Sequence, residues 1–449
     1  MHRIIAVVRL GTMMTGLFLA LAGVPSHVSV VHAAGTPDST SLGQAIDACV
    51  APLVRAGELS GQLIVARDGK VVVERCWGAA DREHRKPMTP TTRMCIASIT
   101  KPVNQVVAFR LVQEHRLALS DTVGRFLPGY PHGRVTIEQL MYHSAGIPHR
   151  VTTDADELLA LSPADVAARA GRTPLLFEPG TRSAYSSAGY TVLAHVLEVA
   201  AGRTWNDLVR EIVIRPLHLD HTVPSAGLAD RLPERAVGYQ PGARGIVMAP
   251  KQDLSFLAGA GSMWSTARDL LRLSVAVLDT TLGRSVRERL VRRGNLRWSG
   301  STGGFFAYLD HDSTTRVTTV FLGNFHNGAP ALLREAMPAL VEGQALAPLQ
   351  KPNPQLAKVA EQVLRRYEGR YDVGATAGLP FTVHDGALWA NDWPLLATSD
   401  TSFFSPRDYG MVTQARDSTG AVTGFNWAIG GRPFPCPRVG DLESPAAKR

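Results

Sequence analysis

The chain has 449 residues, of which 45% are hydrophobic and 19% are charged, so it can bury a large core and is neither disordered nor fibrous. The formal net charge is +8, but the basic residues are dispersed arginines without a long basic run, which argues against a nucleic-acid partner. The length allows two or three domains.

The N-terminus has the pattern of a signal peptide. Basic residues precede an apolar run over residues 10–24, and Val31-His32-Ala33 is a small-residue cleavage site, with Ala20-Leu21-Ala22 as a second possible site. The run is shorter than the about 20 residues that a membrane span needs. We therefore predict that residues 1–33 are removed and that the protein is secreted or periplasmic, without a stable membrane span. The alternative is a retained membrane anchor.

A helix and a β-hairpin are predicted next. Apolar residues recur at helical spacing between Ser41 and Ala56, with Ser41 as the expected N-cap. Two β-rich runs, residues 63–66 and 71–76, flank Asp68-Gly69. Asp-Gly between such runs is a strong hairpin signal. We therefore expect a helix packed on a sheet in this part of the chain.

Ser98-Ile99-Thr100-Lys101 places a serine three residues ahead of a lysine, at the start of an expected helix. Residues three apart lie on one helix face, so Oγ of Ser98 and Nζ of Lys101 should point into the same space. Pro102 is compatible with a first helical turn. A lysine whose pKa is lowered by burial or by nearby cations can accept the serine proton. Taken alone, the pattern favours a capping serine followed by a solvated lysine, and the catalytic interpretation depends on the rest of the chain.

Helices and polar loops follow. Residues 136–147 predict a short helix with His143, for which a structural role is favoured over a catalytic one because no acidic partner is near in sequence. Tyr185 and Ser187 lie on a loop just before an apolar helix, where side chains are presented rather than buried. The helix over residues 266–278 begins with a capping-box-like pattern.

The character of the chain changes after residues 348–354, whose three prolines indicate a linker. Beyond them, short aromatic or β-branched runs are punctuated by Asp385-Gly386 and Gly420. This pattern predicts a small barrel or sandwich. The predicted divisions of the mature chain are a main domain at 42–345, a linker at 346–360 and a C-terminal β-rich domain at 361–440.

Four cysteines, Cys49, Cys76, Cys95 and Cys436, could pair in an oxidising compartment. Three connectivities are possible, and the sequence leaves the pairing open. Their spacing does not resemble a zinc site, so no metal is predicted.

Taken in order, these motifs resemble the serine β-lactamase and penicillin-binding-protein-like superfamily, most of all its class C β-lactamase-related hydrolases. Ser98-Ile99-Thr100-Lys101 matches the nucleophile motif, Tyr185-Ser186-Ser187 matches the Y-x-[NS] element, and residues 261–270 match a later segment. The resemblance covers roughly residues 42–341. It implies an α+β fold (an α/β sandwich): a β-lactamase/transpeptidase-like catalytic domain with a helical subdomain, followed by the small C-terminal all-β, barrel-like domain.

The third family motif, Lys-Thr-Gly or His-x-Gly, aligns with Ser301-Thr302-Gly303-Gly304, so serine stands at the basic position. This departure puts β-lactam recognition in doubt. The resemblance still implies an oxyanion hole made by the backbone N–H groups of Ser98 and Gly304. Ser301, Thr302 and Gly303 are then the expected substrate-binding residues.

The function implied by the resemblance is that of a serine hydrolase. Ser98 would form an acyl-enzyme, Lys101 and Tyr185 would share the proton, and Ser187 would hold Lys101. The substrate would be a small ester, amide or peptide, with cell-wall-derived molecules and β-lactams among the candidates, and no cofactor is implied. The alternatives are a non-catalytic binding or scaffold protein that keeps the fold, and a Ser-His-Asp hydrolase. The latter is disfavoured because the chain has no Gly-x-Ser-x-Gly sequence.

Overall fold

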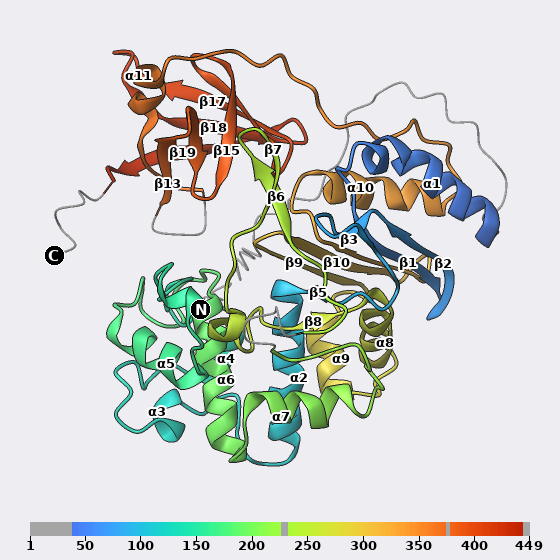
Figure 1. Cartoon of the computed structure of the whole chain (residues 1–449). Helices are drawn as coiled ribbons and strands as arrows, with labels where there is room; N and C mark the ends of the chain where they lie inside the picture. The colour runs from blue at the N-terminus through green and yellow to red at the C-terminus, as the bar shows by residue number, and fades with distance from the viewer. Residues whose placement is uncertain (1–37, 226–231, 374–377, 443–449) are drawn as a thin grey trace, which may run out of the picture.

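The computed structural model describes residues 38–225, 232–373 and 378–442. The predicted signal segment, residues 1–33, lies outside the described residues. A five-stranded sheet, a group of helices beside it and an eight-stranded barrel make up the structure (Figure 1). Among the helices within the described ranges, none is both long enough and apolar enough to cross a bilayer.

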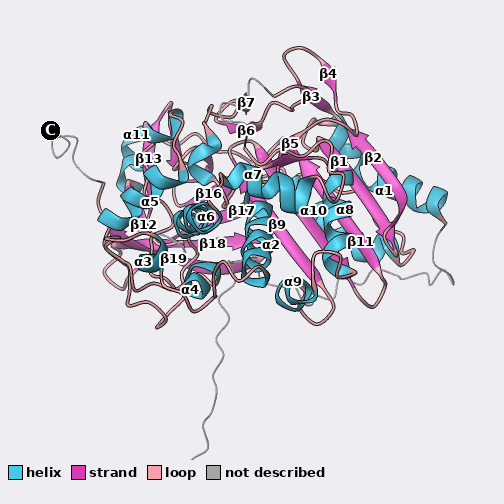
Figure 2. Cartoon of the chain, turned by 90° about the horizontal axis from the view of Figure 1, so that it is seen from below, coloured by secondary structure: helices cyan, strands magenta, loops and turns pink. Residues whose placement is uncertain are grey.

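The central sheet is antiparallel, in the order β2-β1-β11-β10-β9. β9 is the edge strand on the side of the barrel (Figure 2). The predicted hairpin at Asp68-Gly69 is confirmed, since it joins the first two strands. The strands are β1 (Gly61–Arg67), β2 (Lys70–Trp77), β9 (Leu296–Thr302), β10 (Phe305–Asp312) and β11 (Val317–Gly323).

Two hydrophobic cores lie on the two faces of this sheet. Successive residues of a strand face opposite sides, so Leu63 and Val65 pack with the helices α1 (Ser39–Arg55) and α10 (Ala329–Val341). Ile64 joins the larger core on the other face. The helices of that core are α2 (Thr100–Gln113), α3 (Val123–Phe126), α4 (Ile137–Met141), α5 (Pro163–Arg172), α6 (Ser187–Ala201), α7 (Trp205–Val209), α8 (Ala267–Leu278) and α9 (Arg284–Leu290).

Helix α1 begins at Ser39, before the expected cap. Asp38 is its N-cap, because the Asp38 Oδ1 accepts hydrogen bonds from the N–H groups of Thr40 and Ser41 at 2.8 Å each. A carboxylate here also interacts favourably with the positive end of the helix dipole. The capping role predicted for Ser41 is therefore wrong.

Three two-stranded sheets complete the main domain. Two of them bear on the site described below: β5 pairs with β8, and the hairpin of β6 and β7 reaches towards the barrel (Figure 1). Their bounds are β3 (Ala79–Asp81), β4 (Lys86–Pro87), β5 (Met94–Cys95), β6 (Tyr239–Gly242), β7 (Gly245–Met248) and β8 (Trp264–Ser265).

The C-terminal part is a closed eight-stranded barrel, which confirms the predicted barrel-like all-β domain. Its core is rich in aromatic side chains such as Tyr371, Phe381 and Phe425. Residues 344–360, which lead into it, contain no helix or strand. The elements are α11 (Glu361–Leu364), β12 (Gly369–Tyr371), β13 (Leu379–His384), β14 (Ala387–Ala390), β15 (Trp393–Ser399), β16 (Ser402–Ser405), β17 (Gly410–Arg416), β18 (Val422–Ile429) and β19 (Arg432–Gly440).

The loop between β16 and β17 fixes the barrel to the main domain. The hydroxyl of Tyr409 lies 3.0 Å from Oε2 of Glu58 and 3.3 Å from Nδ2 of Asn327. The Tyr409 ring packs over Gly328, where an added Cβ would lie only 2.4 Å from Cγ of the ring. Glu58 is 7% exposed, and a buried carboxylate is costly without such partners. The contact therefore holds the two domains in one arrangement.

Candidate active site

Ser98 lies in a single 3₁₀ turn, Ala97–Ile99, directly before α2. Ala97 has a φ of 44°, in the left-handed region that non-glycine residues rarely adopt and that is frequent at functional sites. The strand before the turn is held by its partner, because Cys95 of β5 pairs with Trp264 of β8. The nucleophile candidate thus stands on a constrained turn rather than within a regular helix.

Lys101, in the first turn of α2, is the buried cation of the site. Its Nζ donates to Ser98 Oγ at 3.2 Å and to Ser187 Oγ at 3.3 Å. A third hydrogen bond goes to the carbonyl oxygen of Ala260 at 2.9 Å. Lys101 is 5% exposed. Burial lowers the pKa of Lys101, and the interaction with Tyr185 opposes that shift.

Tyr185 approaches Ser98 from the loop before α6, with its hydroxyl 2.7 Å from Ser98 Oγ. The cap of α6 is Ser186, whose Oγ accepts from the N–H of Gly189 at 2.8 Å. Ser187 is therefore free of the capping role and faces Lys101. The fold brings Ser98, Lys101, Tyr185 and Ser187 together, although 86 residues separate Lys101 from Ser187.

Two neutral histidines pack against Tyr185. The ring centroids of His143 and His149 lie 4.6 Å and 5.4 Å from that of Tyr185. Nδ1 of His143 lies 3.1 Å from the backbone N of Ser186, and Nδ1 of His149 lies 3.4 Å from that of Ser187. Burial, assisted by the charge of Lys101, lowers the pKa of His143 to about 3 and that of His149 to about 4. Both rings thus accept backbone hydrogen bonds and hold the tyrosine loop in place.

Acid should destabilise the fold through His149. Its pKa is lower in the folded state than its ordinary value of 6.5, so the unfolded chain binds the proton first and stability falls as the pH drops from about 7 towards 4. At pH 5 the loss should be about 2 kcal/mol. Urea unfolding at pH 7 and pH 5 should show that His149→Asn loses about 2 kcal/mol less than the wild type over this range. Equal losses in both proteins would contradict the low pKa.

Gly300 of β9, rather than Gly303 or Gly304, makes the close approach to the nucleophile turn. A Cβ at Gly300 would lie 2.4 Å from the carbonyl oxygen of Ile96 and 2.6 Å from the backbone N of Ser98. Gly304, with a φ of 78°, instead lies against the backbone of Gly238. The role of Gly304 as oxyanion donor stays a prediction; Gly304 belongs to the two-residue turn at 303–304, and the contact with the nucleophile turn is made by Gly300.

The strand pairing indicates which N–H groups of β9 are not used by β10. Thr302 and Phe305 close the β9–β10 turn as paired residues, and hydrogen-bonded pairs alternate with non-bonded ones in an antiparallel ladder. Ser301 is therefore in a non-hydrogen-bonded pair. Its N–H points away from β10, towards the open edge of β9 next to Gly300. Ser301 itself is exposed and Thr302 half-buried.

Gly300→Ala should impair both folding and turnover. The added methyl group would meet backbone atoms of Ile96 and Ser98 at less than 3 Å, so the turn must shift, and a shift of about 1 Å can cost about 10²-fold in rate. Gly303→Ala is the comparison for stability, since its Cβ would meet nothing closer than 3.6 Å. Thermal melting and ester hydrolysis would be measured. A Gly300→Ala protein with wild-type melting and activity would contradict this close contact.

Two cavities flank the turn at Thr302 and Gly303, which line both. The larger, of about 300 Å³, has apolar walls that include Trp264 and Phe305 beside charged residues at its rim. Ser98 lines neither cavity, but Trp264 connects the larger one to the nucleophile turn through its pairing with Cys95. The larger cavity thus offers space for an apolar part of a substrate beside the strand that precedes the nucleophile turn.

All four cysteines have free thiols in the structure. Cys95, close to Ser98 in sequence, is buried, with Sγ 3.6 Å from the carbonyl oxygen of Gly261. Burial raises its pKa to about 12. A thiol that stays protonated is a poor nucleophile, so Cys95 does not compete with Ser98.

Comparison with known proteins identifies the family of this arrangement. The Beta-lactamase family profile matches residues 46–312. Esterase EstB of Burkholderia gladioli is 32% identical over 226 residues, which are 46% of this chain and 56% of EstB. The matched region spans about half the length of the first curated relatives.

Solved structures share the fold at lower sequence identity. SurE has a TM-score of 0.57 at 23% identity, and the match covers 89% of this chain and 99% of SurE. The D-amino acid amidase of Ochrobactrum anthropi has a TM-score of 0.59 at 19% identity, covering 67% of this chain and 98% of the amidase. The match to SurE extends beyond the region matched by the family profile.

Proposed function

The chain belongs to the beta-lactamase family, and on that premise we propose that it is a serine hydrolase that cleaves an ester or amide through an acyl-enzyme on Ser98. The observation that carries the proposal is the position of Ser98 Oγ, 2.7 Å from the Tyr185 hydroxyl and 3.2 Å from Nζ of Lys101. A serine with two potential proton acceptors in hydrogen-bond contact is a nucleophile poised for activation. The names of EstB and the amidase, an esterase and an amide hydrolase, agree with this reaction class.

The proton of Ser98 passes to the pair formed by Lys101 and Tyr185 as Oγ attacks the carbonyl carbon. Burial lowers the pKa of Lys101, which increases the fraction of neutral amine at a given pH. When the tetrahedral intermediate collapses, the pair returns the proton to the departing alcohol or amine. Water then attacks the acyl-serine ester and the pair accepts a water proton. When the bond between the acyl carbon and Oγ breaks, the pair returns this proton to Oγ, so that Ser98 is regenerated and the acid leaves.

The negative oxygen of the intermediate needs backbone donors close to Ser98. We assign the N–H of Ser98 and the N–H of Ser301 to this role, because β9 touches the nucleophile turn at Gly300 and Ser301 faces the open strand edge. One such donor is typically worth about 3 kcal/mol of transition-state stabilisation.

The test of the proposal is covalent labelling of the intact protein. The full chain would be incubated with a fluorophosphonate, a penicillin and a short-chain p-nitrophenyl ester, and its mass measured. The proposal expects one fluorophosphonate adduct, mapped to Ser98 by peptide analysis, together with turnover of the ester. The penicillin sample separates a β-lactam-accepting site from one that excludes β-lactams. Folded protein that gains no adduct and turns over no ester would instead favour the non-catalytic alternative.

A further inference from the structure

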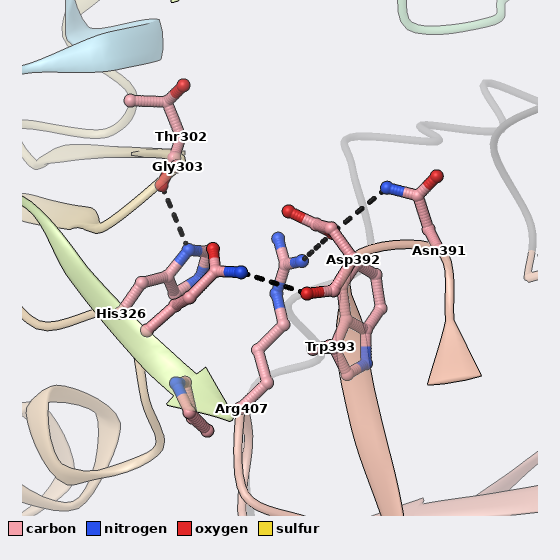
Figure 3. Close-up of a pocket in the computed structure, with 9 residues that line it drawn as sticks. Thr302, Gly303, His326, Asn391, Asp392, Trp393 and Arg407 are labelled. Atoms are coloured by element: carbon pink, nitrogen blue, oxygen red, sulfur yellow. Dashed lines mark hydrogen bonds and ion pairs between the residues drawn. The ribbon is translucent and has the colours of Figure 1, made fainter. Parts of the chain in front are cut away.

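A second, smaller cavity of about 190 Å³ lies between the main domain and the barrel (Figure 3). Thr302 and Gly303, from the turn after β9, form one wall. Asp392, Trp393 and Arg407 form the opposite wall and come from loops and strand ends of the barrel. The cavity therefore exists only because the two domains meet here.

The cavity lies within reach of a substrate bound at Ser98. Gly303 is three residues along the chain from Gly300, which contacts the nucleophile turn. An extended strand covers about 10 Å in three residues. A substrate whose carbonyl carbon meets Ser98 could therefore place a group a few bonds away between Gly303 and the barrel.

Arg407 supplies a cation to this cavity. Its guanidinium carbon lies 3.7 Å from the centroid of the Trp393 ring, and Nη1 lies 3.6 Å from an oxygen of Asp392. The Arg407 side chain is 28% exposed. Across the described ranges of the chain, the guanidinium donates no hydrogen bond, although it carries five N–H donors. Open donors on a stacked arginine that borders a cavity are suited to a carboxylate.

The other titratable groups around Arg407 do not bind it tightly. Burial lowers the pKa of His326 well below its usual range, so the ring is neutral, and its Nδ1 lies 3.1 Å from the Thr302 carbonyl oxygen. Asp392 also accepts a hydrogen bond from Nδ2 of Asn391 at 2.9 Å. Asp408 accepts one from the N–H of Gly410 at 2.9 Å, and burial raises its pKa. The guanidinium thus keeps donor capacity for a ligand.

The loop that carries Arg407 is held rigidly, because Tyr409, two residues later, is bonded to Glu58 in the main domain. On the facing side, the turn after β9 lines the cavity with Thr302 and Gly303, neither of which carries a charge. We propose that Arg407 binds a carboxylate of the substrate, so that the barrel provides the cation of this cavity. This inference rests on the proposed acyl transfer at Ser98.

Matched esters test the proposal by kinetics. The substrates are the mono-p-nitrophenyl ester of glutaric acid, with a free carboxylate, and its methyl ester, which is neutral. Arg407→Ala should lower kcat/KM for the acid roughly 10- to 100-fold, mainly through KM, and change that for the neutral ester less than about twofold. Arg416→Ala is the control: it removes an exposed barrel arginine whose Nε bonds Gln414. Equal losses on the two esters, or no loss on either, would overturn the proposal.

A direct measurement of binding distinguishes a failure of the carboxylate site from a failure of the catalytic proposal. Ser98→Ala protein would be titrated calorimetrically with monomethyl glutarate and with dimethyl glutarate, and the titration repeated with Arg407→Ala added. The proposal expects that monomethyl glutarate binds and dimethyl glutarate does not, and that the double variant binds neither.

If this pattern holds while the wild type hydrolyses no ester, the catalytic proposal fails and the carboxylate site stands. If esters are hydrolysed but acid and diester bind alike, the carboxylate site fails. If free glutarate inhibits hydrolysis but Arg407→Ala affects the two esters equally, the cavity binds free carboxylates. That result would overturn the proposed role of Arg407 in binding the substrate.

Discussion

Replacing Ser98 with alanine should abolish ester hydrolysis and leave the fold intact. Alanine removes the Oγ that would attack the carbonyl carbon, so kcat should fall by about four to six orders of magnitude. The fold should survive because Lys101 keeps two hydrogen bonds, to Ser187 and to the carbonyl of Ala260, so the buried cation is not left without partners. The measurements are steady-state hydrolysis of a p-nitrophenyl ester and thermal melting.

Ser183→Ala is the matched control for this variant. The Ser183 hydroxyl lies on the same loop as Tyr185 and donates only to the carbonyl of Tyr142, at 3.3 Å. Its loss should leave hydrolysis near the wild-type rate. Substantial hydrolysis by purified Ser98→Ala protein, at rates that follow its concentration, would show that another residue is the nucleophile.

The second large effect is expected from Tyr185→Phe. Phenylalanine keeps the ring, which contacts Nζ of Lys101 at 4.6 Å and the ring of His143 at 4.6 Å. Only the hydroxyl at 2.7 Å from Ser98 Oγ is lost. Removal of a group that transfers a proton typically slows the step by 10²- to 10⁴-fold. The acylation rate, measured in the pre-steady state with a p-nitrophenyl ester, should fall by about this factor.

Tyr142→Phe provides the control for a lost tyrosine hydroxyl, because that hydroxyl accepts from Nη1 of Arg289 at 2.8 Å and has no contact with Ser98. It should acylate at the wild-type rate. If Tyr185→Phe also acylates normally, Lys101 acts alone as the base, and the role of Tyr185 is limited to packing against Lys101 and His143.

Several parts of the site could be predicted because they depend on short-range pattern. The spacing of Ser98 and Lys101 predicts that both side chains lie on one side of a helix start. In the structure, Nζ of Lys101 lies 3.2 Å from Oγ of Ser98. The structural role favoured for His143 agrees with its bond to the N–H of Ser186. The first contact lies within one turn, whereas the role of His143 is inferred from the lack of an acidic partner near it in sequence, and its bond to Ser186 spans 43 residues.

Other parts depend on contacts between segments far apart in the chain. The close approach of Gly300 to Ser98 joins residues about 200 positions apart, and a glycine-rich run does not reveal which glycine meets the turn. The roles of His149 and of the Ala260 carbonyl likewise depend on how loops pack around Lys101. A backbone acceptor carries no residue signature, so sequence could not single out Ala260.

By itself, the sequence determined the nucleophile motif, the hairpin that starts the sheet and the β-rich character of the last 80 or so residues, because spacing and periodicity act locally. The tertiary structure alone decided which peptide of β9 lies beside Ser98 and which barrel loop faces the turn after β9. Both depend on the register of an edge strand and on the docking of Tyr409 against Glu58. Register and docking are set by packing over the whole fold, and a one-residue slip would turn every side chain of β9 to the other face.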